Sequence, residues 1–183
     1  MNRIINKDKI FICAAEAAEG GNMNTLEYAI QMELDGRKYY LEQAQKNQDN
    51  ALSKVFNLLA ESEKEHAELL RKRLNEEEYA LHEDSSTSKI KTLFHWLGDY
   101  KASDVRDTTQ LDVYRFATDI EEKSIVLYKG MLEKADNDKD KELFEFLLKE
   151  ENQHLILFDE LVKMLTRPEE WVESAEFGLR EDY

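Results

Sequence analysis

One block of sequence occurs twice in this chain, and the second copy keeps the spacing of the first. Residues 56–66, which read FNLLAESEKEH, return as residues 144–154, which read FEFLLKEENQH. Each copy ends in Glu-x-x-His, and thirty residues before that motif each half carries one further glutamate. The two halves together provide four carboxylates and two imidazoles, at Glu33, Glu63, His66, Glu121, Glu151 and His154. This doubled set predicts a site for two metal ions that both halves build jointly.

Apolar residues recur at three- and four-residue spacing over four long segments, which is the period of amphipathic helices. Asn24 or Thr25 is placed to cap the first helix, and Pro168 is expected to end the fourth. Residues 89–97 and 169–178 are expected to form short additional helices. We therefore predict an all-α four-helix bundle, with its long helices over residues 24–45, 51–81, 109–135 and 141–165.

The positions of the glutamates agree with two antiparallel helical hairpins. The midpoint between Glu33 and Glu63 is residue 48, and the midpoint between Glu121 and Glu151 is residue 136. Both midpoints fall in predicted turns, so each glutamate faces its partner across the hairpin, about 22 Å from the loop. The long connection between the second and third helices allows the hairpins to pack as a pseudo-symmetric pair. All six side chains are then expected to meet in the middle of the bundle.

Composition excludes several other classes of protein. The formal net charge of −15 argues against binding to nucleic acids or to anionic membrane surfaces. Apolar runs in the sequence are too short to span a bilayer, so a soluble protein is expected. A single cysteine, Cys13, excludes a cysteine-based zinc, rubredoxin or iron–sulfur site made by this chain alone, and it fits a cytoplasmic location.

The sequence divides into two parts near its beginning. Residues 1–22 do not follow the helical pattern, and we interpret them as an N-terminal extension that is disordered or lies before the true start at Met23. Residues 23–183 are expected to form the di-metal bundle domain. No site residue is expected in the extension.

The residue types indicate which metals the site would hold. Glutamate and histidine together suit iron, with manganese or a mixed pair as alternatives. Two carboxylates are expected to bridge the metals, while each metal keeps one imidazole and one further carboxylate. Tyr40 and Tyr128 lie two turns after Glu33 and Glu121, where they either pack in the core or assist the site through a hydrogen bond or a radical relay.

Other polar residues have simpler interpretations. A single Glu-x-x-His arises readily by chance in a chain with 40 acidic residues, but two copies in register do not. Asp35 and Asp119 are candidates to orient a histidine ligand. Ordinary surface or loop positions are expected for the remaining residues of interest, namely His82, His95, Glu61, Glu65, Glu68, Glu122 and Glu150.

The motifs resemble the rubrerythrin-like branch of the ferritin superfamily. The resemblance extends over about residues 24–165 and includes AIQMELDGRKYY at residues 29–40 and LAESEKEHA at residues 59–67. It implies a ferritin-like fold, a di-iron centre at the six residues above, a role in oxidative stress and a homodimer. The chain departs from the family by carrying Ser124 where a further ligand glutamate is usual, and by lacking a rubredoxin domain.

These features lead to one main functional hypothesis and two alternatives. The main hypothesis is a di-iron oxidoreductase of the rubrerythrin peroxidase type that reacts with hydrogen peroxide or dioxygen. Such an enzyme would need an external electron donor, for example a rubredoxin-type protein. The first alternative is iron handling, in which ferrous iron is bound and oxidised. The second is a non-catalytic helical bundle or partner-binding module.

Overall fold

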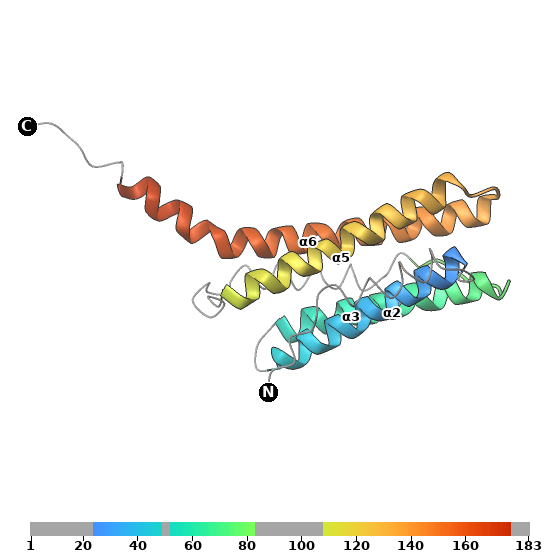
Figure 1. Cartoon of the computed structure of the whole chain (residues 1–183), viewed down its shortest axis with the longest axis horizontal. Helices are drawn as coiled ribbons and strands as arrows, with labels where there is room; N and C mark the ends of the chain where they lie inside the picture. Colours follow the sequence, from blue (N-terminus) through green and yellow to red (C-terminus); the bar gives the residue numbers. More distant parts are fainter. Residues whose placement is uncertain (1–23, 49–51, 83–107, 177–183) are drawn as a thin grey trace, which may run out of the picture.

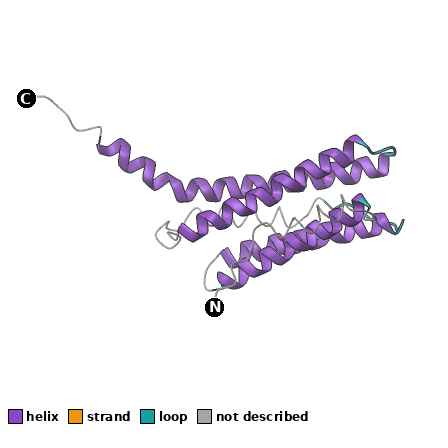
Figure 2. Ribbon diagram, viewed as in Figure 1, coloured by secondary structure: helices purple, strands orange, loops and turns teal. Residues whose placement is uncertain are grey.

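The computed structural model describes residues 24–48, 52–82 and 108–176, and these ranges contain helices without any strand. The predicted extension at residues 1–22 and the predicted short helix at residues 89–97 lie outside them. Four helices make up the bundle (Figure 1; Figure 2). They are α2 (Thr25–Lys46), α3 (Leu52–Leu74), α5 (Thr108–Glu133) and α6 (Asp138–Glu176).

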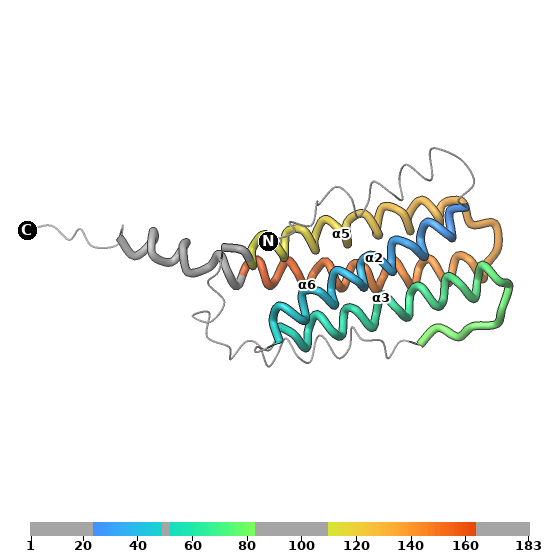
Figure 3. Tube along the Cα trace, turned by 60° about the horizontal axis from the view of Figure 1, so that its bottom comes forward, coloured from blue at the N-terminus to red at the C-terminus, as the bar shows by residue number. Residues whose placement is uncertain are grey.

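The helices associate in two pairs. Helix α2 lies beside α3 and helix α5 lies beside α6, and the members of each pair run in opposite directions (Figure 1; Figure 3). The two pairs stack on one another, with further contact between α2 and α5. The arrangement confirms the predicted fold class, a ferritin-like four-helix bundle.

Local sequence signals explain where α2 begins. The side chain of Asn24 accepts hydrogen bonds from the backbone N–H groups of Leu26 and Glu27. In return, the Glu27 carboxylate accepts a hydrogen bond of 2.9 Å from the backbone N–H of Asn24. This reciprocal capping box satisfies donors that a helix start leaves unpaired, and it confirms the predicted cap.

Helix α3 is shorter than predicted, because it ends at Leu74 and not near Leu81. The backbone N–H of Glu77 donates to the Lys72 carbonyl at 2.8 Å, and that of Glu76 donates to the Arg73 carbonyl at 3.2 Å. These two bonds form a Schellman motif, which closes a helix through a residue in the left-handed conformation. Glu76 adopts that conformation, with a φ of 58°. The sequence offered no glycine to mark this end.

Helix α6 is longer than predicted and corrects the interpretation of Pro168. The helix continues without interruption to Glu176, so the expected end near residue 165 and the separate short helix at residues 169–178 are wrong. A proline removes one backbone hydrogen bond and disfavours a helix interior, but it does not always end the helix.

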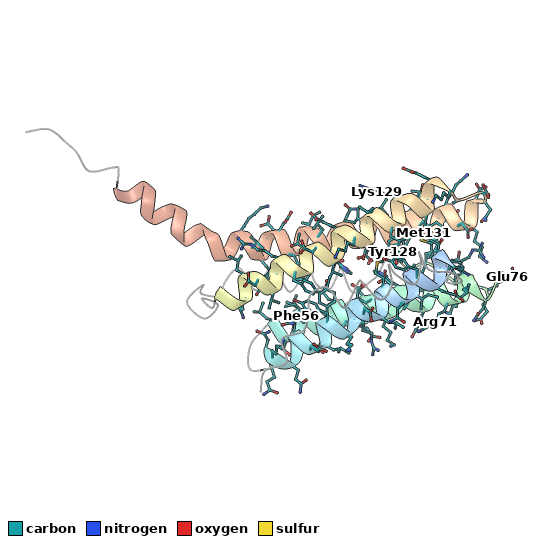
Figure 4. The ribbon with its side chains drawn as sticks, in the orientation of Figure 1. Phe56, Arg71, Glu76, Tyr128, Lys129 and Met131 are labelled. Carbon is teal, nitrogen blue, oxygen red and sulfur yellow. The ribbon has the colours of Figure 1, made fainter. Side chains whose placement is uncertain are left out.

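The apolar core consists of two clusters at opposite ends of the bundle. The first contains Tyr40 and a group of aromatic rings that includes Phe56, Tyr114 and Phe158. The second contains Tyr128 and is mainly aliphatic, with Leu70 and Leu143 among its members. The level between the clusters holds the buried carboxylates and imidazoles, as the next subsection describes. Figure 4 labels Phe56 of the first cluster at the left, and Tyr128 and Met131 of the second cluster further to the right.

Polar contacts fasten the end of α3 to the beginning of α6. Arg73 pairs with Asp140 through two hydrogen bonds, one of which measures 2.8 Å from Nη2 to Oδ2. The hydroxyl of Tyr79 donates to the Lys139 carbonyl at 3.3 Å, and the Lys139 ammonium lies 4.8 Å from the centre of the Tyr79 ring. These contacts attach the segment after α3 to the second hairpin.

None of the helices in the described ranges is long and apolar enough to cross a membrane.

Replacing Glu76 by glycine is expected to stabilise the protein. A residue other than glycine in the left-handed region costs about 1–2 kcal/mol, and glycine avoids this cost at the expense of greater chain entropy when unfolded. We expect Glu76→Gly to raise the free energy of unfolding by about 0.5–1 kcal/mol in urea titrations. The matched variant Glu77→Gly should lower it. A loss of stability in Glu76→Gly would contradict this account of the α3 terminus.

Candidate metal centre

All six residues of the doubled motif meet in the middle of the bundle. Each helix contributes: α2 provides Glu33, α5 provides Glu121, and each Glu-x-x-His motif lies on α3 or α6. None of the six is more than 3% exposed. The antiparallel hairpins therefore place the side chains as the sequence spacing predicted, and tight packing removes them from water.

The six side chains form two overlapping groups, each with ligand atoms that lie within 4.8 Å of one another. One group contains Glu33 and His66, and the other contains Glu121 and His154. Glu63 and Glu151 belong to both groups. This is the arrangement needed for two metal ions that share two bridging carboxylates.

Each imidazole approaches the central glutamate of the opposite hairpin. Nδ1 of His66 lies 2.9 Å from Oε1 of Glu151, and Nδ1 of His154 lies 3.2 Å from Oε1 of Glu63. The outer glutamates are slightly farther away, at 3.4 Å between His66 and Glu33 and 3.6 Å between His154 and Glu121. The two rings stack with their centres 5.7 Å apart. The site thus has the same pseudo-twofold symmetry as the sequence.

Unpaired polar atoms within the cluster favour a metal-binding role. Nδ1 of both histidines and at least one carboxylate oxygen of each glutamate are buried and make no hydrogen bond of good geometry, although these atoms lie as close as 2.9 Å to one another. A buried polar atom in that state costs free energy unless another group satisfies it. Cations bound between these atoms would satisfy them, and nitrogen and carboxylate donors suit iron or manganese. The donor set therefore fits a pair of divalent metal ions.

Two buried tyrosines brace the outer glutamates in a crossed pattern. The hydroxyl of Tyr40 on α2 donates to Oε1 of Glu121 on α5, and the hydroxyl of Tyr128 on α5 donates to Oε1 of Glu33 on α2. Each tyrosine thus orients the glutamate of the other hairpin. The sequence left core packing and a hydrogen bond to the site as alternatives for these tyrosines. Both apply, because each ring packs in the core and each hydroxyl donates to a glutamate of the site.

Serine residues near the site differ between the two halves. Ser62, one turn before His66, is buried, and its hydroxyl lies 3.5 Å from Nε2 of His66. Ser62 was not among the predicted site residues, although a serine four residues before a histidine shares its helix face. The corresponding position before His154 is Glu150. Ser124 instead donates to the Ile120 carbonyl at 3.3 Å, so its hydroxyl is directed to the backbone of its own helix.

Other expectations have mixed outcomes. Glu61, Glu65, Glu68, Glu122 and His82 are exposed as predicted, whereas the prediction that Glu150 faces solvent is wrong because only 3% of it is exposed. Asp35 does not orient a histidine in this structure, since its carboxylate accepts a hydrogen bond from Gln31 at 3.0 Å. His95 lies outside the described ranges.

Burial and mutual repulsion separate the glutamates into two kinds. Desolvation is the largest influence on the pKa of Glu33 and Glu121, and together with repulsion from the central carboxylates it raises both values well above normal. Desolvation would also raise the pKa of Glu63 and Glu151, but nearby polar and charged partners, including both imidazoles, hold these values below normal. The pKa values of the outer pair and of the central pair are thus shifted in opposite directions.

The imidazoles hold protons more tightly in the folded chain than in water. Desolvation alone would lower the pKa of His66 and His154, yet attraction to the surrounding glutamates, Glu151 for His66 and Glu121 for His154, raises both values well above 6.5. Metal binding must displace the protons on the imidazoles and the outer glutamates, because metal ligands bind in their deprotonated forms.

The stability of the metal-free protein is therefore expected to fall as the pH rises. The pKa of both imidazoles is higher in the folded chain than in the unfolded chain, so the folded state holds more protons above about pH 6.5. For each proton that the folded state binds and the unfolded state has released, the free energy of unfolding falls by about 1.4 kcal/mol per pH unit. Melting temperatures of the metal-free protein between about pH 6 and pH 9 test this directly.

The variant His82→Gln is the control for this experiment, because His82 is an exposed histidine outside the cluster. It should show the same decline as the unmodified chain. Constant or increasing stability over this pH range would contradict the raised pKa values of His66 and His154.

Comparison with known proteins agrees with the geometry. The family model described as rubrerythrin matches residues 24–162, which include all six residues of the cluster. Searches of curated proteins and of solved structures give no match. Because the family match extends over most of the chain, from the cap of α2 into the second half of α6, the protein belongs to the rubrerythrin family of ferritin-like, iron-binding proteins.

Proposed function

We propose that this protein is a non-haem di-iron oxidoreductase that reduces hydrogen peroxide or dioxygen with electrons from a separate donor. The observation that carries the proposal is the pair of overlapping donor groups that share Glu63 and Glu151. Membership of the rubrerythrin family supports di-iron chemistry in general. The identity of the reactant is the part that experiment must decide.

Each of the six residues has a role in this proposal. Glu33 and His66 would hold one iron ion, Glu121 and His154 would hold the other, and the two central glutamates would bridge them. Four carboxylates formally balance two divalent cations, which offsets the cost of burying so much negative charge. When bound, the irons would supply the electrons that a peroxide or dioxygen molecule accepts.

The protein around the site would control protons and water. Burial and the neighbouring glutamate charges raise the pKa of Tyr40 and Tyr128 well above normal, so both hydroxyls stay protonated and act as hydrogen-bond donors. They would fix one oxygen of each outer glutamate and leave the second oxygen for a metal. The exclusion of water strengthens each of these electrostatic contacts. A radical-relay role for either tyrosine stays a prediction.

Electrons would have to come from outside the chain. Cys13 is the single cysteine of the sequence, so the chain has no Cys₄ site of the rubredoxin type. A rubredoxin-type protein or another small redox protein would therefore reduce the centre between reactions.

A second candidate function is the binding and oxidation of ferrous iron for storage or transfer. Ser124 favours this possibility, because it occupies the position of the additional family glutamate and donates its hydrogen bond to a backbone carbonyl. A centre without that glutamate has one fewer acidic ligand to exchange when the oxidation state changes. Iron handling requires a single oxidation and no repeated reduction.

Elemental analysis tests the metal site. Protein purified without oxygen from iron-rich cells is expected to contain about two irons per chain, and the double variant Glu63→Ala/Glu151→Ala should lose both because each glutamate serves both donor groups. The variant Glu61→Ala/Glu145→Ala removes two exposed carboxylates and should keep the iron. If the unmodified chain binds no metal even after anaerobic reconstitution, it is a helical bundle without this activity.

Kinetics with peroxide distinguish the two candidate functions. In the presence of excess reductant and a rubredoxin-type donor, an oxidoreductase consumes peroxide steadily over many turnovers. A protein that only handles iron stops after an amount of oxidation that matches the ferrous iron supplied. Peroxide consumption that ends at that stoichiometry would contradict the oxidoreductase proposal and leave the ligand assignment intact.

A further inference from the structure

A groove connects the protein surface with one side of the six-residue cluster. It has a volume of about 610 Å³ and lies where α3, α6 and the segment at residues 75–82 meet. The buried ring of His66 lines it, as does the buried side chain of Glu150, while Glu65, Glu68 and Glu78 line it from exposed positions. We call it the His66 groove. Its walls therefore lead from solvent to a candidate metal ligand.

The charge of the His66 groove suits a cation. Four glutamates line it, and Lys72 is the single lysine or arginine among its lining residues. Three of these glutamates are exposed, and the fourth, Glu150, is only 3% exposed and adjoins Glu151 in the sequence. Carboxylates thus extend from the entrance to the inner end. A cleft lined by one sign of charge raises the local concentration of counter-ions and speeds their association.

The internal duplication provides a built-in comparison. The positions that correspond to Glu65 and Glu68 in the second half are Gln153 and Ile156, and the Ile156 side chain is 61% exposed. The approach to His154 along α6 therefore lacks the two acidic side chains that α3 places beside His66. The six candidate ligands occur at equivalent positions in both halves, whereas Glu65 and Glu68 occur only in the first half, on the same helix as His66.

Contacts around His66 also suit the passage of an ion. The Nε2 atom of its ring is 3.5 Å from the Ser62 hydroxyl, at the long end of the range for a hydrogen bond. The segment at residues 75–82 forms one wall, and the Tyr79 and Lys139 contacts attach it to the second hairpin. One wall of the groove is thus held in place by contacts to the second hairpin. Beside it, Nε2 of His66 makes a long contact of 3.5 Å to Ser62.

We propose that the His66 groove is the route by which divalent metal cations reach the centre. This inference rests on the proposed function, because it requires the six-residue cluster to bind metal. Glu65, Glu68 and Glu78 attract the cation, Glu150 receives it at the inner end, and His66 with Glu33 takes it next. The groove residues affect the rate of metal uptake and leave the final occupancy to the six ligands.

The rate of metal uptake tests whether the acidic side chains of the His66 groove speed the entry of a cation. Co²⁺ is mixed with metal-free protein without oxygen, and the appearance of its visible absorption is followed by stopped flow. Glu65→Gln/Glu68→Gln should slow uptake about threefold to tenfold at low salt and reach the same final occupancy. The difference should shrink at high ionic strength, where exposed charges are screened.

A second double variant controls for the change in net charge that Glu65→Gln/Glu68→Gln causes. Glu122→Gln/Glu145→Gln eliminates two exposed carboxylates outside the groove and changes the net charge equally. Its uptake rate should stay within a factor of about two of the unmodified rate, as expected for charges distant from the path. Equal slowing in both double variants would overturn the route and indicate a general effect of surface charge.

Closing the groove gives an independent test of the same route. Ala80 is an exposed lining residue, so Ala80→Trp adds bulk to the groove without touching the six ligands. Uptake of Co²⁺ should then slow at every salt concentration, with unchanged final occupancy and an unchanged helical circular dichroism spectrum. Uptake at the original rate in this variant would overturn the proposal. Failure of the unmodified chain to bind Co²⁺ or iron would instead refute the proposed function.

Discussion

The burial of four carboxylates at one level of a helical bundle is the constraint on which the rest of this structure depends. Removing an ionised carboxylate from water costs several kcal/mol even after the protein relaxes. The raised pKa values of Glu33 and Glu121 reduce this cost without metal because they favour protonated, neutral carboxyl groups, and the raised pKa values of both imidazoles favour protonated rings beside the central carboxylates. Two divalent cations would replace those protons. The fold is therefore compatible with either state, and protons and metals compete for the same atoms.

The apolar packing at both ends of the bundle shields the six side chains from water along the bundle axis. Aromatic rings around Tyr40 fill one end of the bundle, and aliphatic side chains around Tyr128 fill the other. Both tyrosines reach from their apolar clusters to a glutamate of the opposite hairpin. These hydrogen bonds join the hairpins at the level where the charges lie. Core packing and site geometry thus depend on the same two residues.

Sequence alone predicted the fold class and predicted that six side chains meet at one level of the bundle, because both predictions depend on periodicity and on a repeat of constant spacing. It failed at helix ends, where single backbone conformations decide the outcome. Glu76 closes α3 in a conformation that glycine usually adopts, and α6 continues past Pro168. It also failed for Glu150, since its neighbours on α3 and in the segment after α3 lie far away in sequence.

The departures from internal symmetry show where function acts on a duplicated framework. The candidate ligands and the two tyrosines repeat with the same offset, because two metal positions require the same donors. Ser62 and Glu150 occupy equivalent positions but differ, and Glu65 and Glu68 have no acidic equivalents in the second half. A symmetric pair of metals needs no such differences. The proposed path from solvent accounts for them, because a cation that enters beside His66 passes the acidic side chains on that side.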